Sequence, residues 1–252
     1  NSNEFIAGLH NADIFMIRIF SLFTDNVGVI ANLVMLSIFY LVAYVTYIVM
    51  RLLNIKRWVS VGGSVIFAFL PFMFMRVINH TQLASYYFVP LAVLMAIWVY
   101  EDEKFMLPRK DFFKYKKNIG GLVMAFLIAS QGIGYWQIFA CFFILVTTVT
   151  RFLRSKNVNV IKSGATAIMA IVAAVVIHII PEIFTMLTMN SEELIVRGRS
   201  FADGEMYSLK IAQLLLPVNG HGIDILDKLI SVYNSEMPLV NENRTAYIGA
   251  MG

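Results

Sequence analysis

The sequence predicts an all-α fold built around a polytopic bundle of transmembrane helices, and three observations support this prediction. The 252 residues are 59% hydrophobic and only 14% charged, with a mean hydropathy of +0.72. A water-soluble protein of this size could not bury so much apolar surface. Several uncharged stretches are long enough to cross a bilayer. Basic residues gather in the short loops between those stretches, as is typical of cytoplasmic loops.

Six membrane spans are expected in residues 27–189. The clearest is 27–50, because its 24 residues carry no charge and would form a helix of about 36 Å at ~1.5 Å per residue. The other expected spans are 58–75, 82–100, 119–130, 135–150 and about 164–185.

The stretch 119–150 is divided into two of these spans for reasons of length and charge. Its 32 uncharged residues would form a single helix of about 48 Å, and Gln131-Gly132-Ile133-Gly134 interrupts them near the middle. The loops on both sides, 101–118 and 151–163, are basic, so the positive-inside rule places both in the cytoplasm. Two short helices joined by a tight turn return the chain to the same side.

The basic loops set the expected orientation. Loops 51–57, 101–118 and 151–163 carry three, six and four Lys or Arg residues, which is 13 of the 20 in the chain. This pattern predicts a multi-pass membrane protein, and the resemblance described below implies the bacterial inner membrane. The segments expected on the extracytoplasmic side are 1–26, 76–81, 131–134 and 190–252. An outside N-terminal segment without a leading hydrophobic helix also suggests that at least one span precedes Asn1.

Both ends of the chain are expected to be ordered on the outer side. Residues 1–26 are amphipathic and would form a loop lying along the membrane surface. Residues 190–252 are too long for a simple turn and too apolar for disorder, so we expect a cap segment. Within it, Leu209 to Leu216 could form a short interfacial helix that ends at Pro217.

Several function classes are excluded or disfavoured. The lone Cys141 can form no disulfide within the chain and no cysteine metal site. The sequence has no Walker loop, dinucleotide fingerprint or GxSxG motif. The basic loops account for the isoelectric point near 9.1, so no nucleic-acid partner is implied.

Polar residues of the outer segments are candidates for a site. His10 and Asp13 are three residues apart and would share one face of a helix, with Glu4 close by. Arg76, His80 and Gln82 form a turn that could hold a phosphate or a sugar hydroxyl. Alternatively, these residues solvate or cap an interfacial helix and anchor it at the membrane surface. The further candidates for substrate binding are Tyr86, Tyr87, Tyr135, Arg197, Arg199, His221 and Glu242.

His178 and Glu182 raise the question of a metal site. They are four residues apart, which puts both on one helical face at a spacing that metal ligands use, and the ion could be divalent Mg or Mn. The alternative is that Glu182 lies at the headgroup level and pairs with Arg197 or Arg199.

Four segments together resemble one group of bacterial membrane proteins. These segments are His10 to Phe15, Phe67 to Phe72 leading to Asn79 to Tyr87 with Val89-Pro90-Leu91, Tyr207 to Pro217, and Pro238 to Asn243 with Ala246 to Gly249. The chain is similar to polytopic proteins described as sugar translocases or membrane glycosyltransferases of the GT-C class. Nearly the whole chain takes part in the resemblance.

The resemblance implies a GT-C fold, a polyprenyl-phosphate-linked sugar as donor, and a glycan or lipid acceptor in the cell envelope. It also implies an acidic residue in the first outer loop, acting as base or as metal ligand. Asp13 is the first candidate and Glu4 the second, unless that acid lies upstream of Asn1. Arg76, His80, Arg197 and Arg199 would face the phosphate, and the aromatic residues Tyr86, Tyr87, Tyr135 and Trp136 would stack on sugar.

Two other functions remain open. A translocase of lipid-linked sugars would use the same cavity and cations but needs no catalytic acid. A scaffold subunit of an envelope assembly would tolerate the loss of its outer charges.

Overall fold

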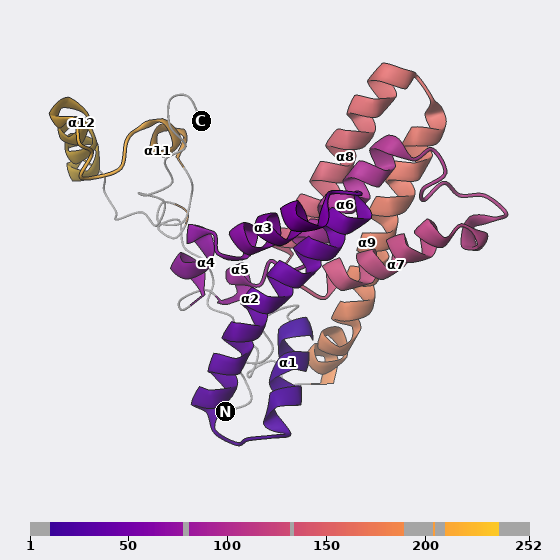
Figure 1. The fold of residues 1–252 in the computed structure, drawn as a ribbon, viewed down its shortest axis with the longest axis horizontal. Coiled ribbons are helices and arrows are strands. Elements are labelled where there is room, and N and C mark those ends of the chain that lie inside the picture. The colour runs from indigo at the N-terminus through magenta and orange to yellow at the C-terminus, as the bar shows by residue number, and fades with distance from the viewer. Residues whose placement is uncertain (1–10, 78–80, 132–133, 189–203, 205–209, 237–252) are drawn as a thin grey trace. The chain divides into compact units, whose positions relative to one another are not determined.

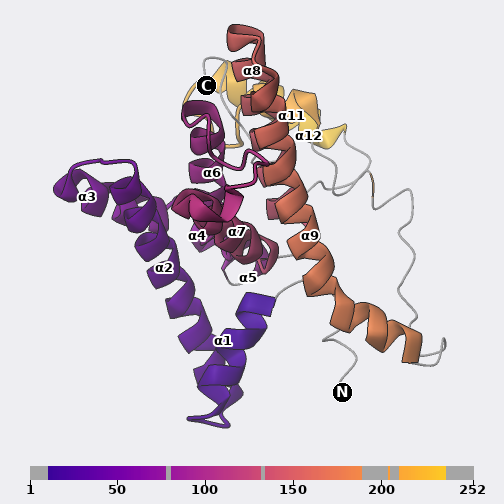
Figure 2. The same ribbon diagram turned by 90° about the vertical axis from the view of Figure 1, so that its right-hand side faces the viewer.

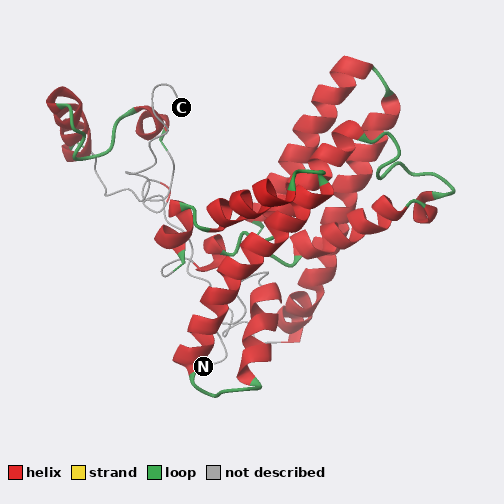
Figure 3. Ribbon diagram, viewed as in Figure 1, coloured by secondary structure: helices red, strands yellow, loops and turns green. Residues whose placement is uncertain are grey.

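The structure is a computed structural model that describes residues 11–77, 81–131, 134–188, 204 and 210–236. In this part of the chain every regular element is a helix, as Figure 3 shows, which confirms the predicted all-α class. The chain divides into two compact units, Asn1–Met189 and Asn190–Gly252.

Four helical segments of the first unit are long and apolar enough to cross a membrane. They are α2 (Val27–Leu52), the segment Arg57–Arg76, α8 (Tyr135–Ser155), and the part Val158–Pro181 of α9 (Val158–Thr188). These apolar helices indicate a membrane protein, as the composition predicts.

Two of the expected spans are interrupted. The stretch 58–75 breaks into α3 (Arg57–Ala68) and α4 (Pro71–Arg76). The reason is Pro71, because Leu70 before it takes an extended conformation with ψ of 143°. Contrary to prediction, the stretch 82–100 is not one helix. It contains the end of α5 (Thr81–Ala84), a non-helical turn at Ser85–Phe88, and α6 (Val89–Glu101). At 13 residues, α6 spans only about 20 Å, less than the hydrocarbon core of a bilayer.

The uncharged stretch 119–150 lies in two separate helices, α7 (Lys116–Ala129) and α8. Gly134 precedes α8 with a φ of 75°, a conformation that glycine adopts without strain. The side chain of Gln137 reaches back to the end of α7. Its Nε2 donates to the carbonyl oxygens of Ile128 and Ala129, each at 3.1 Å, and of Gln131 at 2.5 Å. The amide thus caps carbonyls at the C-terminal end of α7, where the Ile128 carbonyl also accepts from the Gln131 backbone N–H at 3.3 Å.

Two buried apolar clusters hold the first unit together. One joins α6, α7, α8 and α9, with Leu94 and Ile144 among its fully buried members. The other joins α1 (Asn11–Ser21), α2, α3, α4 and α5, with Ile38 and Tyr87 among its most deeply buried members. Figures 1 and 2 show the turn between α1 and α2 at one end of this unit and the turn between α8 and α9 at the other.

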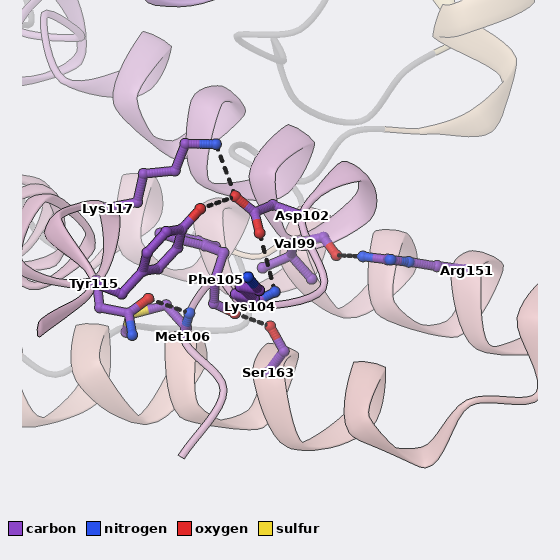
Figure 4. Close-up of polar contacts among 10 residues, drawn as sticks. Val99, Asp102, Lys104, Phe105, Met106, Tyr115, Lys117, Arg151 and Ser163 are labelled. Carbon is purple, nitrogen blue, oxygen red and sulfur yellow. Dashed lines mark hydrogen bonds and ion pairs between the residues drawn. The ribbon is translucent and has the colours of Figure 1, made fainter. Parts of the chain in front are cut away.

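Partly buried and exposed polar contacts at Asp102 fix the loop between α6 and α7 (Figure 4). The carboxylate of Asp102 accepts hydrogen bonds from Tyr115 Oη at 2.5 Å, Lys117 Nζ at 2.7 Å and the Lys104 backbone N–H at 3.0 Å. Partial burial by itself raises the pKa of Asp102, but together the hydrogen bonds and the charge of Lys117 outweigh it, and the pKa falls below its usual value. The side chain is therefore a fixed anion in a basic loop.

The second unit contains two described helices, α11 (Ile211–Leu215) and α12 (Asp224–Ser235). The first lies in the segment for which a short helix is expected and ends just before Pro217. Gly220 lies between the two helices, and its backbone N–H donates a 2.7 Å hydrogen bond to Oδ1 of Asp227 in α12.

Candidate functional site around Asp13

Helix α1 is amphipathic, and its two sides have different surroundings. Ala12, Met16, Ile17 and Phe20 pack against the cluster that contains Ile38 and Tyr87. On the other side, the Phe15 side chain is 64% exposed, and the following Leu22 and Phe23 are also exposed. A helix with one packed side and exposed large apolar residues on the other is suited to a membrane surface.

The start of α1 is held by two segments that are distant in sequence. The backbone N–H of Ala12 donates to the carbonyl of Ser130 at 3.1 Å. The Asn11 amide nitrogen lies 2.9 Å from Nδ1 of His178 and 3.3 Å from the His178 carbonyl oxygen. These contacts join the first turn of α1 to the end of α7 and to α9.

Asp13 is the buried acid of this junction. The residue is only 8% exposed. Its Oδ1 accepts hydrogen bonds from Ser85 Oγ at 3.1 Å and from Tyr87 Oη at 3.0 Å. Both donors come from the turn between α5 and α6, and both residues are buried. The break in the expected span 82–100 is thus what brings two hydroxyl groups to the carboxyl group.

The surroundings of Asp13 make its carboxylate more basic than one in water. Burial raises the pKa of the carboxyl group above its usual value, although the hydrogen bonds from Tyr87 and Ser85 act in the opposite direction. A carboxyl group with a raised pKa and a fixed orientation is a candidate for accepting a proton from a reacting hydroxyl.

Two glutamines support the turn that holds Asp13. Gln131 Oε1 accepts a 2.7 Å hydrogen bond from the backbone N–H of Phe88, and Gln137 fixes the end of α7 beside it. The Nε2 of Gln131 is fully buried and has no hydrogen-bond partner among the residues that the structure describes. A buried N–H group without an acceptor raises the free energy of the folded state, so a further hydrogen-bond acceptor would stabilise this junction.

Tyr86 and Tyr87 lie in the core rather than on an open surface. Tyr86 Oη donates to the Phe67 carbonyl at 2.8 Å, and its ring packs edge-on against the Phe67 ring at 5.3 Å. Tyr87 is 1% exposed. Since protein atoms surround both rings, we assign Tyr87 a role in orienting Asp13 in place of the expected sugar stacking.

The remaining candidates lie in different places. Arg76 ends α4, is half-buried, and has no hydrogen bond or ion pair within the described ranges. Tyr135 begins α8 and is exposed, whereas Trp136 beside it packs near Tyr86. His221 belongs to the second unit, where its Nδ1 accepts from the Ile223 backbone N–H at 3.2 Å.

Other candidates fall outside what the structure describes. Gln82 in α5 and Glu182 in α9 have a described backbone only. The residues outside the described ranges are Glu4, His10, His80, Arg197, Arg199 and Glu242.

The expected metal ligand His178 has both ring nitrogens occupied. Asn11 contacts the His178 carbonyl, which can only accept, so the nearby amide group presents its N–H to Nδ1. Nε2 lies 3.2 Å from the Phe126 carbonyl and therefore carries the ring proton. This arrangement favours the alternative to a metal site at His178, while the side chain of the second expected ligand, Glu182, lies outside what the structure describes. Throughout the described ranges, no group of three His, Cys, Asp or Glu side chains could hold a metal ion.

Sequence reasoning missed the contacts made by Asn11, Ser85 and Gln131. A signal was present, because Ser85 and Gln131 are polar residues within apolar stretches, where polar groups need partners. The signal does not identify those partners, since they lie 40 or more residues away.

The fold and this site define an all-helical protein with four potential membrane spans and a buried acid at the base of an amphipathic helix. A family model matches residues 15–233, and the chain therefore belongs to the DUF6311 family, which is described as a domain of unknown function. Neither curated proteins nor solved structures gave a match to the chain.

Proposed function

We propose that the protein is a membrane glycosyltransferase that moves a sugar from a polyprenyl-phosphate donor to a cell-envelope acceptor on the outer side of the bacterial inner membrane. The observation that carries the proposal is the Asp13 carboxyl group, which is buried, held by Ser85 and Tyr87, and raised in pKa. It is also the acid that the resemblance to GT-C proteins would select.

The proposed reaction assigns Asp13 the role of general base. The carboxylate takes the proton of the acceptor hydroxyl while the acceptor oxygen bonds to the anomeric carbon of the sugar. The bond from that carbon to the phosphate oxygen breaks, and polyprenyl phosphate leaves as an anion. Arg76, together with His80, would stabilise the charge on the phosphate.

The proposed orientation places α1 outside and the basic loops in the cytoplasm. The opposite positions of the α1–α2 turn and the α8–α9 turn support it (Figure 2). In this orientation Asp13 meets the donor after its sugar has been moved to the outer side.

The test uses the full-length protein in liposomes with polyprenyl-phosphate sugars and candidate envelope acceptors. Both sugar transfer and movement of the donor across the bilayer are measured. We expect Asp13→Asn to lower transfer by about 10²–10⁴-fold, which is the contribution of a general base. Asp25→Asn is the matched control, because Asp25 is an exposed acid after the same helix.

Two outcomes would reject the proposal. If Asp13→Asn transfers sugar as fast as the wild type, Asp13 is not the general base. Movement of the donor with every glycosidic bond intact would identify a translocase of lipid-linked sugars, the alternative function.

A further inference from the structure

We propose that a groove between α6 and α8 binds a phospholipid whose headgroup carries both a phosphate and an amine, such as phosphatidylethanolamine. In this arrangement one acyl chain fills the groove, the phosphate contacts Arg154, and the ammonium contacts Glu101. The site is separate from the Asp13 junction and does not depend on the proposed transferase activity.

The groove is apolar and has the size of a small-molecule site. Its volume is about 520 Å³, within the range of about 300–1,000 Å³ that is typical of ligand pockets. The lining residues come from the C-terminal parts of α6 and α8, and most are apolar: Val93, Ala96, Ile97, Tyr100, Glu101, Phe143, Val146, Thr147 and Thr150.

The polar end of the groove adjoins the basic loops. Both helices begin near the Gln131 and Gln137 contacts. They pack along each other (Figure 1). Tyr100 and Glu101 are at the far end of α6, directly before the loop that contains Asp102. An acyl chain in the groove would therefore place its headgroup beside the side chains of that loop and of the last turn of α8.

Two arginines near this end have different surroundings. Arg151 donates to the Val99 carbonyl at 2.7 Å (Figure 4). It also lies 3.6 Å from Glu103 Oε1, so its charge is engaged by the protein. Arg154 is exposed, and its Nη1 donates to Oη of the lining residue Tyr100 at 2.6 Å. Within the described ranges Arg154 pairs with no acid. Tyr100 thus holds a guanidinium group at the mouth of the groove, and most of its five N–H donors remain for a phosphate.

Glu101 determines which headgroup fits. It lines the groove, is exposed, and has no ion pair within the described ranges. A purely anionic headgroup would gain the attraction of Arg154 but meet the repulsion of Glu101. A headgroup with a phosphate and an ammonium group matches both charges, and the ammonium can donate hydrogen bonds to the carboxylate. Pockets with basic residues between membrane helices are known to bind lipid headgroups.

The test is native mass spectrometry of the purified full chain, titrated separately with phosphatidylethanolamine and with phosphatidylglycerol of the same acyl chains. We expect tighter binding of phosphatidylethanolamine. Arg154→Gln should weaken the binding of both lipids about fivefold, the effect of about one basic residue at a membrane surface. Glu101→Gln should weaken phosphatidylethanolamine only and remove its advantage. Lys162→Gln removes a charge from an exposed position of α9 and is the matched control.

A variant that fills the groove tests the place of the acyl chain. Thr147→Phe should reduce the binding of both lipids, and the thermal midpoint of each variant shows whether it is folded. Equal affinity of the wild type for both lipids would overturn the proposal, whichever variants fold. An unchanged preference in Glu101→Gln, or the same affinity in Arg154→Gln as in Lys162→Gln, would also overturn it.

Discussion

At the scale of single residues, the contacts of Asp13 predict a pH effect. Burial raises the pKa of this carboxyl group, and the Tyr87 hydroxyl partly counteracts that rise. Tyr87→Phe removes a hydrogen bond to the carboxylate, so the pKa should rise further and the base should be protonated at higher pH. The acid limb of the transferase pH–rate profile should therefore move to higher pH. Tyr86→Phe is the control, because the Tyr86 hydroxyl contacts Phe67 instead, and an equal displacement in both variants would refute the role of Tyr87.

A second prediction at this scale concerns the contact between α8 and α9. A Cβ atom added to Gly164 would lie 2.0 Å from Thr148 Oγ1 and 2.7 Å from its Cγ2. Thr148 is buried and its hydroxyl donates to the Ile144 carbonyl, so it cannot move aside freely. We expect Gly164→Ala to destabilise the protein by about 1–3 kcal/mol, measured by thermal unfolding in detergent.

Two further variants complete this measurement. Gly120→Ala should not be destabilising, because nothing lies within 4 Å of the added atom. Thr148→Ala combined with Gly164→Ala should recover part of the lost stability, since it removes the two closest atoms. Equal stability of Gly164→Ala and the wild type would show that the helices do not pack this closely.

The residues of the site were only partly predictable. Asp13 stands out in the sequence as an acid on an amphipathic helix, and its selection needs no tertiary information. Its partners Ser85 and Tyr87 depend on a turn within an apolar stretch, and hydropathy alone does not reveal that turn. The metal role considered for His178 stays a prediction, because spacing along a helix cannot show that Asn11 and Phe126 contact both ring nitrogens.

At the scale of elements, the end of α8 allows a stabilising substitution. Lys156 follows this helix in the left-handed conformation, with φ of 53°, and its N–H donates to the Phe152 carbonyl at 2.8 Å. Glycine adopts this conformation without the steric cost of a Cβ atom. Lys156→Gly should raise the free energy of unfolding by about 1 kcal/mol. Lys162→Gly, which changes the same residue type inside α9, should lower it by about 1 kcal/mol in the same thermal assay. If Lys156→Gly also lowers the free energy of unfolding, the left-handed conformation assigned to residue 156 is wrong.

The elements themselves were predicted better than their interruptions. Uncharged length alone identifies α2 and the apolar part of α9, because nothing in those stretches competes with a helix. The shorter helices are harder to predict. Pro71 marks the break before α4, but the turn at Ser85–Phe88 is stabilised by Asp13 and Gln131 from elsewhere in the chain. Hydrogen bonds between residues so far apart in the sequence cannot be predicted from a local sequence pattern.

At the scale of the whole molecule, the composition and the basic loops predict more than the class of protein, because they also predict which end faces the cytoplasm. The α1–α2 turn and the basic loop between α6 and α7 should lie on opposite sides of the membrane. Asp25 in the turn and Lys110 in the loop are both exposed and suit a labelling experiment.

The measurement places one cysteine at a time in a Cys141→Ser background and treats intact cells with a maleimide that cannot cross membranes. Asp25→Cys should be labelled in intact cells, whereas Lys110→Cys should be labelled only after the membrane is permeabilised. Labelling of both positions in intact cells would contradict the separation of the two ends by a bilayer. The reverse pattern would place Asp13 on the cytoplasmic side, where a donor that has already been flipped outward could not reach it, and the proposed reaction would fail together with the proposed orientation.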